Sequence, residues 1–309
     1  MGFRTVAVRG GRILLNGEPI YLKGICVHED HITRGRSLTE TDRRDIFRHI
    51  RDLGCNFLRL AHYPHSRRMA EMADRLGVLL WEEVPVYWRI IWKNRKTFAD
   101  ASNQLRELIL RDRNRASVIL WSVANETPVD AAGRTSFLAR LSRQAHRMDP
   151  SRLTTAALFK KKGDDGRIYV DDPLAAELDV IGVNEYHGWY GEGSPAAADV
   201  MRSFSNFKYP DKPVILSEFG GGARAGFRGK GKFSEGYQAE LYRHQLAALR
   251  QCGSIQGLTP WILMDFRSPM RHNRYQRGFN RKGLVDADRK TRKLAFKVYR
   301  DFVPPDVSA

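Results

Sequence analysis

VILWSVANE, residues 118–126, is a run of β-branched, leucine and tryptophan residues that ends in an amide and a carboxylate. Its apolar residues are continuous rather than alternating with polar ones, which is typical of a parallel strand covered on both faces. Seven further short apolar runs lie along the chain, and seven of the eight runs are continuous in this way; the further runs span residues 21–28, 56–62, 78–84, 154–158, 179–186, 213–219 and 256–263. The sequence therefore predicts eight strands of a parallel sheet.

Segments with the helical spacing of apolar residues fall between most of these strands. Thr39 and Ser234 each stand at the start of such a segment, where a hydroxyl can cap the first turn. The segments span residues 40–53, 66–76, 98–115, 131–148, 234–250 and 289–301. Strands that alternate with helices in this way predict the α/β class and a closed (β/α)8 TIM barrel rather than an open doubly wound sheet.

Residues 1–20 are predicted to form an N-terminal β-hairpin that leads into the barrel, and residues 21–309 are predicted to form the barrel as a single domain. Gly10-Gly11 and Asn16-Gly17 are pairs that favour tight turns between short apolar runs. We expect the hairpin to close the bottom of the barrel.

The net charge bears on the ligands that the protein can bind. The 309 residues include 52 Lys and Arg against 35 Asp and Glu, a formal charge of +17 that attracts anions. The charge is dispersed, and its runs at 160–162 and 223–232 sit beside glycines, as is typical of solvated loops, so no specific nucleic-acid binding is predicted. No apolar run approaches the ~20 residues of a membrane helix, and no secretory signal opens the chain. We therefore expect no membrane association and a cytoplasmic protein.

Neither a metal nor a cofactor is predicted. The three cysteines form no C-x-x-C pair, and no G-x-G-x-x-G follows the first predicted strand. His28-Glu29-Asp30-His31 lies after that strand, where metal-dependent barrels also place histidines, but the H-x-H spacing of such sites is missing.

Two glutamates end predicted strands, Glu126 on the fourth and Glu218 on the seventh. In a (β/α)8 barrel the reacting groups sit at the C-terminal ends of the strands. A single carboxylate in such a place is more often a helix cap or an arginine partner. A pair that closes two apolar strands instead favours catalysis, because two carboxyl groups can face each other across a bound sugar as acid and nucleophile.

Several segments resemble, in order and spacing, the barrel domain of glycoside hydrolase family 2. They are KGICVHEDH (23–31), FLRLAHYPH (57–65), WEEVP (81–85), ILWSVANE (119–126), VNEYHGWY (183–190), VILSEFG (214–220) and PWILMDFRSP (260–269). The resemblance implies a retaining glycosidase with Glu126 as acid/base and Glu218 as nucleophile. The two carboxyl groups of such enzymes lie ~5–5.5 Å apart.

The same resemblance implies the residues that bind the sugar. Asn125 corresponds to the residue that hydrogen-bonds the sugar 2-hydroxyl, and Tyr186 to the tyrosine that contacts the nucleophile. His28 and Tyr190 correspond to further residues of the sugar pocket. Trp261 resembles the tryptophan against which the sugar stacks.

The identity of the sugar is implied by the segment after the last predicted strand. Asn280-Arg281-Lys282 is an Asn-x-Lys sequence that resembles the signature by which β-glucuronidases bind the C6 carboxylate. A lysine charge and a neutral donor favour a uronate over a neutral hexose. Glu185 departs from this pattern, because many β-glucuronidases have a basic residue there, and we expect it to make the pocket less positive.

The leading hypothesis is thus an exo-acting, retaining β-glucuronidase that hydrolyses a small-molecule glucuronide. A β-galactosidase or another neutral-sugar enzyme of the same fold is the first alternative, and a carbohydrate-binding barrel without turnover is the second. In the family, jelly-roll and immunoglobulin-like domains normally precede the barrel and can form an oligomer interface. A homo-oligomer therefore stays open for this chain.

Overall fold

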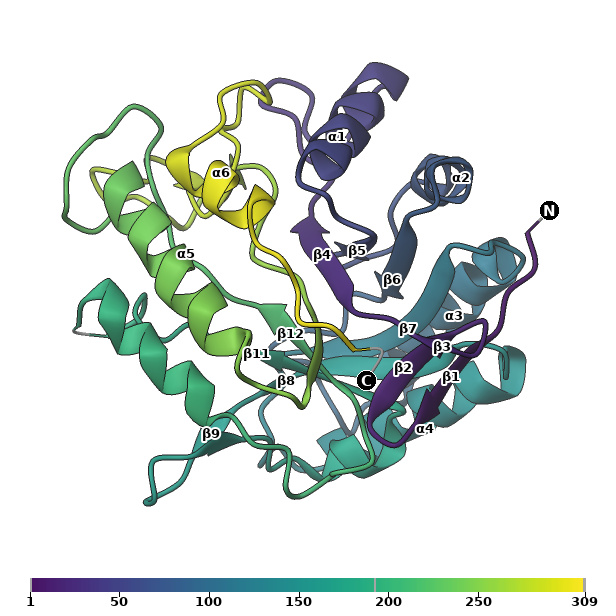
Figure 1. Ribbon diagram of the computed structural model, residues 1–309. Coiled ribbons are helices and arrows are strands. Elements are labelled where there is room, and N and C mark those ends of the chain that lie inside the picture. The colour runs from purple at the N-terminus through teal and green to yellow at the C-terminus, as the bar shows by residue number, and fades with distance from the viewer. Residues whose placement is uncertain (1, 192, 308–309) are drawn as a thin grey trace.

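The computed structural model describes residues 2–191 and 193–307. Eight parallel strands close into a barrel in the order β11-β12-β13-β4-β5-β6-β7-β8, and helices surround it (Figure 1). The strands are β4 (Leu22–Val27), β5 (Phe57–Leu60), β6 (Leu79–Glu83), β7 (Val118–Asn125), β8 (Leu153–Phe159), β11 (Val180–Asn184), β12 (Val214–Glu218) and β13 (Ile255–Leu258). Each strand overlaps one predicted run, so the predicted (β/α)8 barrel is confirmed.

The six predicted helical segments are helices in the structure. Their bounds are α1 (Glu40–Asp52), α2 (Arg67–Leu76), α3 (Arg95–Asp112), α4 (Arg134–Met148), α5 (Glu235–Leu249) and α6 (Leu294–Arg300). Thr39 caps α1 as predicted: its hydroxyl accepts from the Asp42 N–H, and the Asp42 carboxylate accepts from the Thr39 N–H. The Ser234 hydroxyl likewise accepts from the N–H of Tyr237 at 3.1 Å and caps α5.

Two connections of the barrel contain short elements in place of an α-helix. After β8 the chain forms a small hairpin of β9 (Lys161–Lys162) and β10 (Ile168–Tyr169), followed by the 3₁₀ helix η1 (Pro173–Glu177). After β11 it forms the 3₁₀ helix η2 (Pro195–Ser203).

After β13, β14 (Phe266–Arg267) pairs antiparallel with β15 (Phe279–Asn280). The loop between these last two strands lies at the C-terminal end of the barrel, beside the site described below.

The N-terminal segment is a three-stranded antiparallel sheet, one strand larger than the predicted hairpin. Its strands are β1 (Val6–Arg9), β2 (Arg12–Leu15) and β3 (Glu18–Pro19). Both predicted turns are present, and their four residues have φ between 54° and 89°, which suits tight hairpin turns. The second turn adds the third strand. Ile13 of β2 belongs to the apolar cluster inside the barrel, so this sheet covers the N-terminal end of the barrel.

The inside of the barrel changes character along its axis. Near the N-terminal end it is filled by apolar side chains that include Leu22, Phe57 and Trp81. Trp81 fits because Gly182 lies opposite it, where an added Cβ would stand 2.6 Å from the indole ring. Nearer the C-terminal ends of the strands the buried side chains are polar, and Arg59 is fully buried there. The apolar cluster inside the barrel thus lies beneath a layer of buried polar side chains.

Candidate active site

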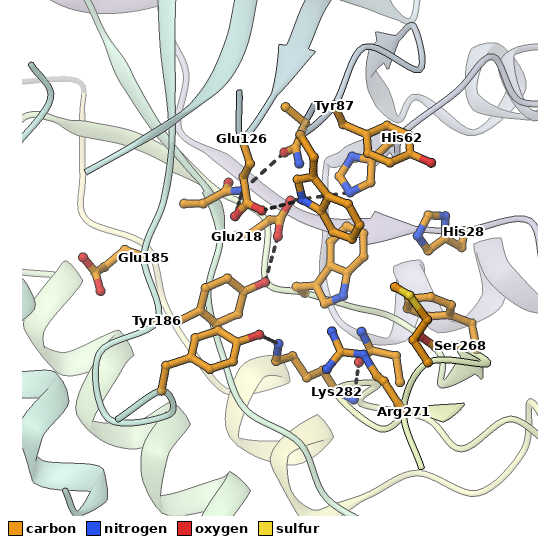
Figure 2. A pocket seen from close by; sticks show the side chains of 18 of the residues that line it. His28, His62, Tyr87, Glu126, Glu185, Tyr186, Glu218, Ser268, Arg271 and Lys282 are labelled. Carbon is orange, nitrogen blue, oxygen red and sulfur yellow. Dashed lines mark hydrogen bonds and ion pairs between the residues drawn. The ribbon is translucent and has the colours of Figure 1, made fainter. Parts of the chain in front are cut away.

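A cavity of about 760 Å³ opens at the C-terminal ends of the barrel strands. Glu126 follows β7 directly, and Glu218 is the last residue of β12. Figure 2 shows both carboxylates directed into this cavity from neighbouring parts of its wall. Glu126 has φ 48°, in the left-handed region, so the backbone turns out of the strand at this residue.

Glu218 is held by donors on both of its oxygens. Arg59 Nη1 donates to Oε1 at 2.8 Å, and the Tyr186 hydroxyl donates to Oε2 at 2.8 Å. His62 Nε2 lies 3.8 Å from Oε1. Burial and the nearby Glu218 charge raise the pKa of Tyr186, so the phenol keeps its proton and acts as a donor. These contacts stabilise a negative charge on Glu218 and fix its orientation.

Arg59 connects Glu218 to a second carboxylate beneath the cavity. Its guanidinium lies 3.3 Å from Glu83, and its Nη2 donates to Asn125 Oδ1 at 2.7 Å. Glu83 also accepts from Trp81 Nε1 at 3.0 Å and lies 2.7 Å from His62 Nδ1. Burial raises the pKa of Glu83, but Arg59 and His62 outweigh it and the net pKa is lowered. Burial lowers the pKa of Arg59, but the charges of Glu83 and Glu218 outweigh burial, so the net pKa of Arg59 is raised.

Glu126 lies in a different environment from Glu218. Asn184 Nδ2 donates to its Oε1 at 2.9 Å, and Trp88 Nε1 donates to its Oε2 at 3.1 Å. Burial raises the pKa of Glu126, and the negative charge of Glu218 raises it further, while the two donors oppose this shift. Glu126 therefore keeps a proton to higher pH than an exposed glutamate does, as a general acid requires.

Asn125 is oriented by its neighbours. Its Oδ1 accepts from Arg59 at 2.7 Å and from Asn184 Nδ2 at 3.3 Å. Because the carbonyl side of the amide is engaged, the Nδ2 side is the one left for a ligand, and Asn125 lines the cavity. The predicted contact to a sugar hydroxyl is compatible with this orientation.

Aromatic rings form one wall of the cavity. His62 stacks on Trp261 with ring centroids 4.8 Å apart and an interplanar angle of 11°. His28 meets the same indole edge-on at 5.1 Å and lies 4.4 Å from the Phe266 ring. Burial, followed by the charge of His62, keeps the pKa of His28 well below its usual value, so its imidazole is neutral at ordinary pH. This wall offers flat surfaces to a sugar ring.

Lys282 also lines the cavity and is only 4% exposed. Its Nζ donates to the Tyr190 hydroxyl at 2.5 Å and lies 4.5 Å from the ring centroids of both Tyr186 and Tyr190. Asn280 holds the local turn, because its Oδ1 accepts from the Lys282 N–H at 3.1 Å. Burial and then the charge of Arg271 lower the pKa of Lys282 to about 7.

Glu185 lines the cavity, and two basic side chains lie beside its carboxylate. Its carboxylate lies 3.2 Å from Lys160 and 2.5 Å from His187 Nδ1, and Figure 2 shows it at a distance from Glu126 and Glu218. Burial raises the pKa of Glu185, but His187 and Lys160 outweigh it, so the group is ionised and balanced locally. The Lys160 ammonium therefore offsets its negative charge.

All nine residues predicted for the site line this one cavity: His28, Asn125, Glu126, Tyr186, Tyr190, Glu218, Trp261, Asn280 and Lys282. Sequence reasoning assigned no role to Arg59, Trp88, Asn184 or Arg271. A signal existed for Arg59, which is the only charged residue in the apolar run FLRLA. Trp88 and Arg271 lie in loops, where no periodicity shows which side chains point inward.

Metal-ligand clusters and membrane-spanning helices are both absent among the described residues. Within residues 2–191 and 193–307, no group of three or more His, Cys, Asp or Glu side chains is placed to hold a metal ion. Across the same residues, no helix is long and apolar enough to cross a membrane.

Comparison with known proteins defines the family. Residues 6–304 match the TIM barrel domain of the glycosyl hydrolases family 2. The chain therefore belongs to glycoside hydrolase family 2 and contains its barrel domain.

Curated relatives include a β-glucuronidase of Streptococcus agalactiae, 29% identical over 95% of this chain and 52% of that protein. Another is the β-glucuronidase of Homo sapiens, 30% identical over 96% of this chain and 46% of that protein. The chain thus spans about half the length of these relatives.

Solved structures match this chain with similar sequence identity and similar coverage. A β-D-glucuronidase structure of Dictyoglomus thermophilum has a TM-score of 0.87 and 29% identity, covering 100% of this chain and 55% of that one. A β-galacturonidase of Eisenbergiella tayi bound to galacturonate has a TM-score of 0.87 and 28% identity, covering 97% of this chain and 54% of that one.

Proposed function

We propose that this protein hydrolyses β-glucuronides with retention of configuration, Glu218 acting as nucleophile and Glu126 as acid/base. The observation that carries the proposal is the contrast between the two glutamates. Glu218 accepts from Arg59 and Tyr186, which stabilise its negative charge, whereas burial and the charge of Glu218 raise the pKa of Glu126. Opposite environments for two facing carboxyl groups are what acid and nucleophile need.

In the first step the Glu218 carboxylate attacks the anomeric carbon and forms a covalent glycosyl ester. Glu126 gives its proton to the glycosidic oxygen, and the aglycone leaves as a neutral alcohol or phenol. The Asn125 Nδ2 group can donate a hydrogen bond to the sugar 2-hydroxyl. This contact strengthens in the transition state, as positive charge develops on the ring.

In the second step Glu126 is a carboxylate and removes a proton from a water molecule. The water oxygen bonds to the anomeric carbon, the ester bond to Glu218 breaks, and the sugar leaves with its original configuration. Tyr186 supports both steps, because its hydroxyl donates to Glu218 Oε2 whenever that oxygen carries charge.

Lys282 supports the choice of a uronate. A buried ammonium has three donors, and the described residues offer it one hydroxyl and no carboxylate. A C6 carboxylate supplies the missing negative charge, which a neutral hexose cannot do. The β-glucuronidase names of several relatives support the same sugar, and the similar β-galacturonidase structure adds the C4 epimer as a second candidate.

The test is a panel of p-nitrophenyl β-glycosides comparing glucuronide, galacturonide, galactoside, glucoside and mannoside. We expect kcat/KM to be highest for the glucuronide, and NMR to detect the β-anomer of the sugar as first product. A preference for galactoside or mannoside would move the protein to the neutral-sugar alternative, and no turnover of any glycoside would favour a binding role. The cytoplasmic location stays a prediction, and a homo-oligomer stays open.

A further inference from the structure

Lys282 and Arg271 are two cations on one wall of the cavity. Both line it, and Figure 2 shows their side chains next to each other, with Arg271 reaching in from the loop between β14 and β15. Neither makes an ion pair with a carboxylate among residues 2–191 and 193–307. Like charges placed side by side in a poorly hydrated wall repel each other, which is unfavourable unless an anion binds between them.

The loop that carries Arg271 is fixed at its base. The Arg271 N–H donates to the Ser268 carbonyl at 2.9 Å, and the Arg271 carbonyl accepts from the Gly278 N–H at 2.7 Å. These bonds close the loop beside Asn280 on β15. The backbone thus places Arg271 at the cavity, and its guanidinium interacts with the Tyr190 hydroxyl, which also accepts from Lys282.

We infer that Arg271 is a second cationic contact for the C6 carboxylate, which is held between the Arg271 guanidinium and the Lys282 ammonium. This inference rests on the proposed function. A guanidinium presents paired donors that match both oxygens of a carboxylate, whereas an ammonium acts as a point charge. Arg271 would accordingly set the orientation of the acidic group, and Lys282 would supply charge at close range.

The two cations are also coupled through the charge of Lys282. Several groups face its ammonium: Arg271 from the β14–β15 loop, Glu218 from β12, Glu126 after β7, and the Tyr186 and Tyr190 phenols after β11. Burial lowers the pKa of Lys282 most and Arg271 lowers it next, while Glu218 and Glu126 raise it. Removing Arg271 should therefore raise the pKa of Lys282 and keep the ammonium charged to higher pH.

The experiment compares Arg271→Ala with Arg274→Ala. Arg274 is a matched control, since it carries the same charge on the same loop, is exposed and does not line the cavity. kcat/KM is measured for p-nitrophenyl β-glucuronide and β-glucoside from pH 5.5 to 9, and the ratio of the two is used. In this ratio, effects on the shared chemistry of Glu126 and Glu218 cancel.

At pH 6 we expect Arg271→Ala to lower the glucuronide-to-glucoside ratio of kcat/KM about 10-fold, because the variant loses a charged hydrogen bond that solvent partly screens. Arg274→Ala should change it less than about twofold. In the wild-type protein the ratio should fall as pH rises through about 7, because Lys282 loses its proton there. In Arg271→Ala this fall should move to higher pH, a result that a merely structural role for Arg271 would not give.

An unchanged ratio in Arg271→Ala, or an equal loss in both variants, would overturn the inference. If the wild-type protein prefers glucuronide and Lys282→Ala removes that preference while Arg271→Ala keeps it, the inference alone fails. If the wild-type protein shows no preference for glucuronide over glucoside, the proposed function itself fails. A fall of the ratio that stays at the same pH in Arg271→Ala would contradict the coupling.

Discussion

Arg59 and Lys282 are both buried cations at the same cavity, yet their surroundings differ. Arg59 contacts the carboxylates of Glu83 and Glu218 and the amide of Asn125. Lys282 contacts one hydroxyl and two aromatic rings. A buried charge that is fully paired stabilises a fixed arrangement, and one that is unpaired costs free energy until a ligand pairs it. The comparison separates the part of the cavity that holds the reacting groups from the part that selects the sugar.

The largest expected effect is on turnover, when either of the two reacting carboxylates is removed. We expect Glu218→Gln to remove turnover, and Glu126→Ala to lower kcat/KM by about 10²–10⁴, the usual contribution of a general acid and base. Azide should distinguish the two roles. It should give the β-glycosyl azide with Glu126→Ala, and the α-azide with Glu218→Ala by direct displacement. NMR of the products checks this, and α-azide from Glu126→Ala would reverse the assignment.

A second expected effect concerns stability. Arg59→Met should lower the free energy of unfolding by ~3–5 kcal/mol, because it leaves two buried carboxylates without their cation. Urea unfolding followed by circular dichroism measures it. Arg75→Met, at an exposed position of α2, is the control and should change stability by less than ~0.5 kcal/mol. Equal losses in the two variants would mean that the Arg59 network is not a stabilising unit.

The difference between these two regions also explains what the sequence could and could not predict. Glu126 and Glu218 end continuous apolar strands, so the closure of the barrel places them at one end, and the sequence pattern was sufficient for that. The third strand of the N-terminal sheet was missed, since Glu18–Pro19 is too short to show a period. Arg271 was missed because it lies in an irregular loop of 11 residues between β14 and β15. Its course is set by backbone hydrogen bonds among its own residues, such as Gly278 N–H to Arg271, and no periodic pattern of apolar residues reveals them.

Lys282→Ala probes the unpaired cation directly. We expect kcat/KM for the glucuronide to fall roughly 10- to 150-fold, the loss of a charged hydrogen bond of ~1.5–3 kcal/mol. The glucoside should change little, since it has no carboxylate. Asn280→Ala should show the same selectivity more weakly, because a neutral donor is lost. Equal effects on both sugars would mean that Lys282 does not select the sugar.

The smallest expected effect concerns Trp88, whose indole N–H donates to Glu126 Oε2 at 3.1 Å. Trp88→Phe keeps a ring and removes the donor, so the already raised pKa of Glu126 should rise further. Because the acid must be protonated in the first step, activity should persist to higher pH. The substrate that reports this is phenyl β-glucuronide, whose poor leaving group needs the proton.

The measurement is the ratio of kcat/KM for phenyl and p-nitrophenyl β-glucuronide against pH. The p-nitrophenyl group leaves with little help from an acid, whereas both substrates carry the same carboxylate, so titration of Lys282 cancels in the ratio. Trp92→Phe is the control, because Trp92 lies beyond β6 on the same segment, packs against Phe137 and does not line the cavity. The alkaline fall of the ratio should move to higher pH in Trp88→Phe alone. A fall that moves to lower pH, or moves equally in both variants, would show that the hydrogen bond from Trp88 does not hold down the pKa of Glu126.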